Sequence, residues 1–202
     1  GTVMLVTGMA QLLTAPFAAP LESRFGARPL TAIGFALFAL GLGLSSFQPR
    51  TADFAAMFWP QVLRGIAIMF CLLPPTRIAL GTLPEKEVAD ASALFNLMRN
   101  LGGAIGIALI DTILYGRVAI YAENFRARLL TGDLGAAKAI GLDPSLLAHR
   151  PPGPPRPDEI AFVRPLVEKA SLALCVNEAW AMLAGVAVLG FLLVLLVRER
   201  PN

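Results

Sequence analysis

The sequence has few charged residues, one histidine and two cysteines. Charged side chains make up 15% of the 202 residues, whereas a soluble domain carries roughly 25%. Hydrophobic residues make up 56%, and the mean hydropathy is +0.66. Because the apolar residues are gathered into long runs, the sequence indicates a membrane protein rather than a soluble domain with a large core.

No group of residues has the spacing of a known type of enzyme site. The sequence contains no serine–histidine–aspartate set, no HExxH motif, no phosphate-binding loop and no paired metal ligands. His149 is isolated, and Cys71 and Cys175 lie in apolar runs, where buried small side chains are expected rather than a disulfide or a metal site. We therefore expect no enzyme activity, no catalytic residues, no metal and no cofactor.

The sequence also lacks an initiator methionine and a signal peptide. Gly1 stands inside an apolar run, without a basic region before it or a small-residue cleavage site after it. We therefore expect the chain to be the C-terminal part of a longer polypeptide.

Five apolar segments are long enough, or nearly so, to cross a bilayer, which takes about 20 residues. They are residues 1–21, 30–47, 54–73, 91–115 and 170–197. Since lipid does not tolerate unpaired backbone groups, the sequence predicts an all-α, polytopic transmembrane helix bundle. Pro74 and Pro75 predict a kink or an early end of the third helix. Thr82 and Glu85 have the spacing of a capping box that would start the fourth.

Basic residues in the connections predict the orientation of the chain. Six follow the odd-numbered spans, whereas the second short connection holds only Arg50. The side with more basic residues is the cytoplasmic one, so we expect the C-terminus in the cytoplasm and no nucleic-acid partner. The six are Arg24, Arg28, Arg77, Lys86, Arg198 and Arg200.

The chain accordingly divides into three segments. Residues 1–115 would form four transmembrane helices, residues 116–169 an extracytoplasmic loop, and residues 170–202 the last helix with a short cytoplasmic tail. In the loop, apolar residues recur at helical spacing from Val118 to Leu129, which predicts an amphipathic helix on the bilayer or on its own protein. Prolines at 151–155 predict an extended stretch.

Polar residues inside the spans are the candidate functional residues. A charge at mid-bilayer costs about 2.5–3.5 kcal/mol, so such residues face protein or a water-filled cavity. Arg64 lies near the middle of the third span, one turn after Gln61, and fits a functional role or a structural one. The fourth span carries a polar stripe at helical spacing, formed by Ser92, Asn96, Arg99, Asn100 and Gly103.

Small residues and two acids complete the set of candidates. Gly102 and Gly106 form a small-xxx-small pair, which with Gly103 would let another helix approach closely. Asp111 and Glu178 are weaker candidates for a proton or polar site. We favour an interfacial position for Glu178, beside Trp180 in an aromatic belt.

Residues 83–106, LPEKEVADASALFNLMRNLGGAIG, resemble the Leu-Pro-x6-Ala-Ser-x3-Asn-x2-Arg-x2-Gly-Gly-x2-Gly stretch of the EmrB/QacA-like drug:proton antiporters. These are members of the major facilitator superfamily. The turn at 21–28 is similar to the cytoplasmic Asp-Arg-x-Gly-x-Arg motif of facilitators. Arg24, Gly26 and Arg28 match, whereas Ser23 replaces the aspartate, with Glu22 adjacent.

The resemblance implies five spans of a major-facilitator C-terminal half, working as part of a proton-coupled multidrug efflux transporter in the inner (plasma) membrane. Small amphipathic compounds would be exported by alternating access, with protons, the lipid bilayer, the N-terminal transporter half and a periplasmic adaptor as partners. It also implies a cavity lined or braced by Arg64, Asn96, Arg99 and Asn100.

Two alternatives remain open from the sequence. One is a facilitator-type transporter of another substrate, such as a siderophore, a lipid precursor or a sugar. The other is a truncated, non-transporting membrane remnant. A membrane enzyme is disfavoured, because no nucleophile is clustered with histidine or aspartate at membrane depth.

Overall fold

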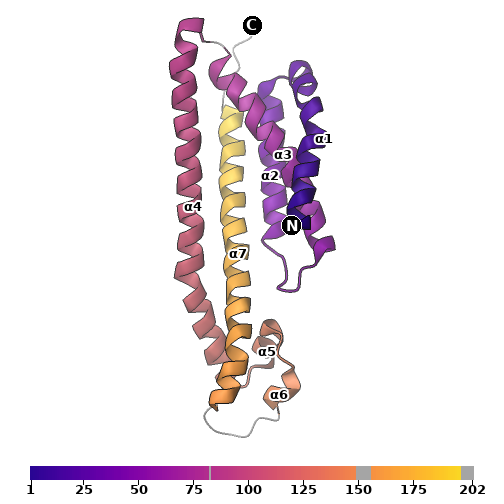
Figure 1. Ribbon diagram of the computed structural model, residues 1–202, viewed down its shortest axis with the longest axis vertical. Helices are drawn as coiled ribbons and strands as arrows, with labels where there is room; N and C mark the ends of the chain where they lie inside the picture. The colour runs from indigo at the N-terminus through magenta and orange to yellow at the C-terminus, as the bar shows by residue number, and fades with distance from the viewer. Residues whose placement is uncertain (82, 149–155, 197–202) are drawn as a thin grey trace. The chain divides into compact units, whose positions relative to one another are not determined.

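A computed structural model describes residues 1–81, 83–148 and 156–196, and all regular structure in these residues is helical. The helices are α1 (Thr2–Phe25), α2 (Ala27–Ser45), α3 (Phe54–Leu80), α4 (Glu85–Leu130), α5 (Leu134–Ile140), α6 (Pro144–Ala148) and α7 (Pro157–Leu196). Five of them, α1 to α4 and α7, are long and apolar enough to cross a membrane. The predicted fold class, an all-α transmembrane helix bundle, is confirmed (Figure 1).

Some predictions concern residues outside the described part of the chain. These are the capping residue Thr82, His149, the proline-rich stretch at 151–155 and the basic residues Arg198 and Arg200. Predictions about them stay predictions.

Of the two outcomes predicted at Pro74 and Pro75, the early end of the third helix is wrong, because α3 continues through both prolines to Leu80. The kink stays a prediction. Transmembrane helices tolerate proline where neighbouring groups satisfy the freed backbone carbonyls. Pro74 is itself buried in the helix packing. Tertiary contacts therefore outweigh the local tendency of proline to break a helix.

The helices α4 and α7 extend well beyond the spans predicted at 91–115 and 170–197. At 1.5 Å per residue, α4 is about 69 Å long and α7 about 60 Å, whereas the hydrocarbon core is about 30 Å thick. Residues 118–129 are helical, as their spacing predicted, and form part of α4. Hydropathy marks where a helix can meet lipid, but a helix continues wherever one apolar face finds a packing partner.

The chain forms two compact units, each described by itself. The first unit consists of Gly1–Ile107 with the described part of Trp180–Asn202, and the second unit is Ala108–Ala179. In the first unit, α3 packs against both α1 and α2 (Figure 1). Ala18, Leu30 and Phe70, one from each of these helices, form its apolar core.

Glycines bring the helices of the first unit into backbone contact. A Cβ atom on Gly65 of α3 would lie 2.5 Å from the Thr7 carbonyl oxygen and 2.6 Å from the Ala10 Cβ on α1. A Cβ on Gly34 of α2 would lie 2.8 Å from the Phe70 Cβ on α3. Small residues allow this close packing where no hydrophobic force drives helices together in lipid.

The second unit has an apolar core of its own, built from the end of α4, from α5 and from the start of α7. The core residues are Ala122, Phe125, Leu129, Ala136, Ala137, Ile140, Leu142, Val167 and Ala170. Most of the described residues between 116 and 169, expected as a loop, therefore belong to a folded helical unit.

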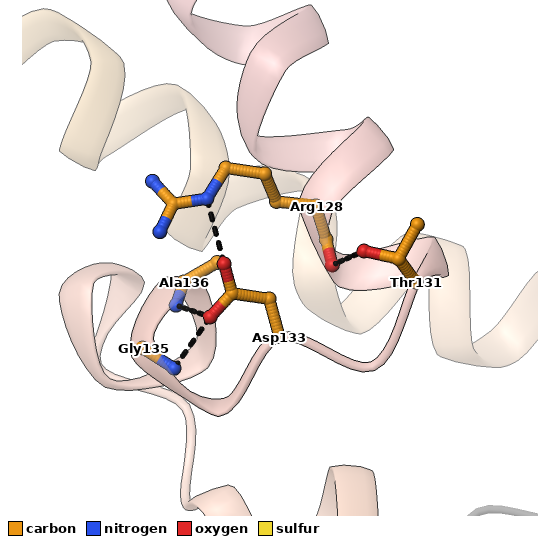
Figure 2. A network of polar contacts seen from close by, with 5 residues as sticks. All are labelled: Arg128, Thr131, Asp133, Gly135 and Ala136. Carbon is orange, nitrogen blue, oxygen red and sulfur yellow. Dashed lines mark hydrogen bonds and ion pairs between the residues drawn. The ribbon is translucent and has the colours of Figure 1, made fainter.

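A polar network fixes the turn from α4 to α5 (Figure 2). Asp133 Oδ1 accepts hydrogen bonds from the backbone N–H groups of Gly135 (2.8 Å) and Ala136 (3.1 Å), so Asp133 caps α5. Its Oδ2 pairs with Arg128 Nε at 2.8 Å. Gly132 ends α4 at φ 80°, a conformation that favours glycine. The Thr-Gly-Asp sequence carries these stop and start signals, and the sequence reasoning missed them.

Candidate functional site

A buried polar cluster lies within the first unit, around the predicted site residue Arg64. On α3, the residue Arg64 is only 8% exposed, and Gln61 one turn earlier is 5% exposed. Gln61 Oε1 accepts a hydrogen bond from the Thr7 hydroxyl on α1. Two polar groups of α3 are therefore shielded by neighbouring helices, as hydrocarbon requires.

Arg64 contacts an aromatic ring on α7. Its guanidinium carbon lies 4.5 Å from the centre of the Trp180 ring, within the range of a cation–π interaction. Its Nε donates to the Pro60 carbonyl oxygen at 3.3 Å. The sequence reasoning assigned Trp180 to an aromatic belt and missed this contact, because one sequence does not reveal which helices meet.

The helix α2 packs tightly beside this cluster. A Cβ on Gly41 would lie 3.0 Å from the Arg64 Cγ and 3.1 Å from the Pro60 carbonyl oxygen. The stem of Arg64 is therefore held between α3 and the backbone of α2, while its guanidinium reaches Trp180. We call Gln61, Arg64 and Trp180 the α3 cluster.

The predicted polar stripe of α4 is open in the described structure. Asn96, Arg99 and Asn100 are all exposed, and Asn96 Nδ2 donates to the Ser92 carbonyl oxygen at 3.0 Å. Among the described residues, no hydrogen bond or ion pair joins these three to Arg64. The structure therefore does not bring the four cavity candidates together.

The glycines of α4 are open as well. A Cβ placed on Gly102, Gly103 or Gly106 would meet no atom within 4 Å. No helix in the described part of the chain packs on the small-residue surface that they form. The role predicted for these glycines in helix packing stays a prediction.

The turn between α1 and α2 joins two other helices. Gly26 stands between them with φ 88°, and the side chains on either side of it reach across the first unit. Glu22, buried on α1, pairs with Arg77 of α3 at 3.5 Å. Arg28 donates from Nε to the Val194 carbonyl oxygen at 3.2 Å, and also bonds the Leu195 carbonyl.

The remaining residue of this motif is exposed. Arg24 lies over the ring of its neighbour Phe25, at 5.7 Å from the ring centre. Ser23, which stands at the aspartate position of the facilitator motif, donates to the Pro20 carbonyl oxygen. The carboxylate that reaches another helix at this turn is thus Glu22.

Glu178 has partners within the second unit. Its Oε1 accepts a hydrogen bond from the Tyr121 hydroxyl, and its Oε2 lies 3.3 Å from Arg117 Nε. Asp111 is exposed on α4. The two weak candidates therefore differ, since Glu178 links α4 to α7 through two side chains.

The described residues contain no cluster of histidine, cysteine, aspartate and glutamate that could hold a metal ion. Cys71 and Cys175 are free thiols.

Comparison with known proteins shows which proteins the chain is related to, which the geometry of the site does not show. The chain is 46% identical to the colistin resistance protein EmrB of Acinetobacter baumannii over 124 residues, 61% of this chain and 24% of that protein. It is 30% identical to a multidrug resistance protein B homolog of Mycobacterium tuberculosis over 159 residues, 74% of this chain and 28% of the relative. The predicted resemblance to EmrB-like drug transporters is confirmed. No family model matches the chain.

A third relative is the multidrug export protein EmrB of Escherichia coli, 28% identical over 123 residues, 60% of this chain and 24% of the relative. This EmrB-like chain spans about a quarter of the length of the relatives that it matches. Together with five helices long and apolar enough to cross a membrane, the relatives make it a multi-pass membrane protein.

Proposed function

We propose that this chain forms part of a proton-coupled multidrug efflux transporter that exports small amphipathic compounds by alternating access. The observation that carries the proposal is the polar stripe of α4. Asn96, Arg99 and Asn100 are exposed on a helix long and apolar enough to cross a membrane. Since a charge facing lipid costs about 2.5–3.5 kcal/mol, the stripe needs a polar surface or a water-filled cavity to face.

In this proposal the cavity lies between the present helices and an N-terminal half of the transporter. The open glycines Gly102, Gly103 and Gly106 would receive a helix of that half. Arg64 would contribute from α3. The relatives named for multidrug export and drug resistance support a drug as the cargo.

The proposal also assigns an orientation and partners. The transporter lies in the inner membrane with its C-terminus in the cytoplasm, as the basic residues indicate. Residues 116–169, which fall in the second unit, are then extracytoplasmic. A periplasmic adaptor would bind the transporter on that side.

Proton coupling is proposed to depend on acids elsewhere in the transporter. Glu178 is engaged by Arg117 and Tyr121, so we assign it a structural role in holding α4 and α7 together within the second unit. Asp111, which is exposed on α4, is a weak candidate for a proton-carrying acid.

The test of export uses the whole transporter in cells that lack their own efflux pumps. Expression should lower the accumulation of a fluorescent amphipathic dye, and an ionophore that collapses the proton gradient should abolish the difference. An empty vector is the control. If expression changes neither dye accumulation nor resistance to any of a panel of drugs, another transported substrate or a non-transporting remnant becomes the better hypothesis.

The test of the cavity uses cysteine labelling in a background without Cys71 and Cys175. Asn96→Cys and Arg99→Cys should react with a membrane-impermeant maleimide, and a bound transport substrate should slow the reaction. Leu97→Cys, on a different face of α4, is the matched control and should stay unlabelled. Two unreactive cysteines at 96 and 99 would show that the stripe is not open to water.

A further inference from the structure

Arg64 is a buried residue without an anionic partner in the described part of the chain. An arginine side chain has five N–H donors and no acceptor. One of the five, on Nε, bonds the Pro60 carbonyl oxygen, and the described residues form no ion pair or other hydrogen bond with Arg64. A desolvated charge with this little compensation is unfavourable, so a counter-charge is required.

The carboxylates nearest along the packed helices have other roles. Asp53 caps the start of α3 by accepting from the Ala56 N–H at 2.9 Å, and it lies about 17 Å from Arg64 along the helix. Glu22 is engaged by Arg77, about 20 Å from Arg64 towards the other end of α3. On α7, Glu178 is two residues before Trp180 and is engaged by Tyr121 and Arg117. Each of these three carboxylates therefore has another partner.

The neighbours of Arg64 add donors rather than acceptors. The amide oxygen of Gln61 is occupied by the Thr7 hydroxyl, which leaves the amide N–H groups without an acceptor among the described residues. Gln61 and Arg64 are three residues apart and therefore share a face of α3. Trp180 covers the guanidinium face with an aromatic ring, and its only polar group is an N–H donor.

We propose that the α3 cluster binds the anionic oxygen group of an amphipathic molecule, such as a carboxylate. The Nη groups of Arg64 and the amide of Gln61 donate hydrogen bonds to the anion, and the Trp180 ring supports the guanidinium. A planar guanidinium suits a carboxylate because it can donate two parallel bonds. This inference rests on the proposed function and deepens it, because it makes amphipathic anions a preferred class of substrate.

The same chemistry could come from a carboxylate elsewhere in the transporter. A substrate anion and such an internal carboxylate both neutralise Arg64, but they predict different results. With a substrate anion, removal of the charge changes which amphiphiles bind. With an internal carboxylate, it changes stability and leaves the preference among amphiphiles unchanged.

The experiment measures binding to the whole transporter in lipid nanodiscs with three probes of equal chain length. They are dodecanoate, dodecyltrimethylammonium and the uncharged dodecyl maltoside. We expect Arg64→Gln to weaken dodecanoate binding about tenfold, a loss of about 1.4 kcal/mol, and to leave the other two affinities unchanged. Arg64→Lys, which keeps the charge but loses the planar fork, should give an intermediate affinity.

The matched control is Arg24→Gln, since Arg24 is an exposed arginine at the end of α1. It should change none of the three affinities. If Arg64→Gln does not fold, Gln61→Met serves as the second variant. It removes the amide donors with little change in size and should weaken dodecanoate binding severalfold.

Two outcomes would overturn the inference. In one, Arg64→Gln changes all three affinities equally or none of them. In the other, it lowers only the thermal stability of the ligand-free protein, which points to an internal carboxylate. The inference and the proposed export can fail separately. Arg64-dependent binding of dodecanoate without dye efflux contradicts export, whereas proton-dependent efflux with indifference to Arg64 contradicts the anion site.

Discussion

The helices α3 and α4 carry the same kinds of residue in opposite surroundings. Each is an apolar helix with at least one glycine, an arginine and an amide side chain one turn before that arginine. On α3, Arg64 and Gln61 are buried, and Gly65 is in backbone contact with α1. On α4, Arg99 and Asn96 are exposed, and a Cβ on Gly102, Gly103 or Gly106 would meet no atom within 4 Å.

The difference teaches that polar residues in a spanning helix indicate a polar neighbour without identifying it. For α3 the neighbours are α1, α2 and the Trp180 end of α7, all within the first unit. For the polar stripe of α4, the described residues supply no hydrogen bond or ion pair from another helix. The stripe that the sequence marks most clearly is therefore the one that this chain leaves open.

We expect the largest loss of stability from disrupting the close packing of α3 on α1. Gly65→Val would place side-chain atoms against the Thr7 carbonyl oxygen, at a position where a Cβ alone would be 2.5 Å away. Because backbone must move to relieve this, we expect a destabilisation of about 3 kcal/mol or more. The measurement is the yield and thermal unfolding of the purified whole transporter.

Gly43→Val on α2 is the control, because a Cβ on Gly43 meets no atom within 4 Å. It should leave the yield nearly unchanged. Equal losses for both variants would mean that the close approach of α1 and α3 is not what Gly65 provides.

The open side of the comparison is tested with Arg99→Ala. We expect efflux to fall severalfold while membrane insertion is retained, because Arg99 is exposed in this chain and lines the cavity in the proposed function. Dye efflux is measured at equal amounts of protein in the membrane. Unchanged efflux would leave Arg99 with no more than a packing role.

The ion pair between Glu22 of α1 and Arg77 of α3 tests whether burial of a charged side chain decides its effect on stability. The Glu22 side chain is 3% exposed and that of Arg77 is 66% exposed. Arg77→Gln leaves a carboxylate buried and unpaired, which should cost about 3 kcal/mol. Glu22→Gln leaves only a solvated arginine and should cost about 1 kcal/mol or less.

Thermal unfolding of both variants and of the double variant checks this asymmetry. The double variant should resemble Glu22→Gln. Equal losses for the two single variants would contradict the view that burial of Glu22, rather than the pair itself, decides the energy.

The smallest effect is expected at Asp133, which extends the comparison to the second unit. The Arg128 guanidinium, together with the backbone N–H groups of Ala136 and Gly135, lowers the pKa of Asp133 below its usual value. The ionised cap is therefore favoured above the unfolded-state pKa of about 4, and its contribution is lost as the pH falls through the lower folded-state value.

Amide hydrogen exchange of Gly135 and Ala136 measures this effect locally, after correction for the intrinsic pH dependence of exchange. Asp133→Ala should raise their exchange and remove the extra loss of protection at low pH. Asp143→Ala, which removes a hydrogen bond from the Ser145 N–H instead, should leave them unchanged. Equal exchange in wild type and Asp133→Ala would contradict the capping role.

Prediction from sequence succeeded where a property depends on one helix at a time. The five apolar helices follow from composition and from the length of the apolar runs, whereas the role of the polar stripe of α4 stays a prediction. The helix ends were less well predicted. Pro74 and Pro75 did not end α3, and α4 and α7 ran on past their apolar windows, because packing within each unit decides where a helix stops.

The sequence alone determined that the chain is built from membrane-spanning helices, because lipid selects apolar runs of sufficient length and forces their backbones to be helical. Only the tertiary structure decided which polar residues are covered. Arg64 meets Trp180 and Glu22 meets Arg77 because helices far apart in sequence pack together, and one sequence carries no local signal for such a pairing. The second unit likewise became visible only when α4, α5 and α7 were seen to share one core.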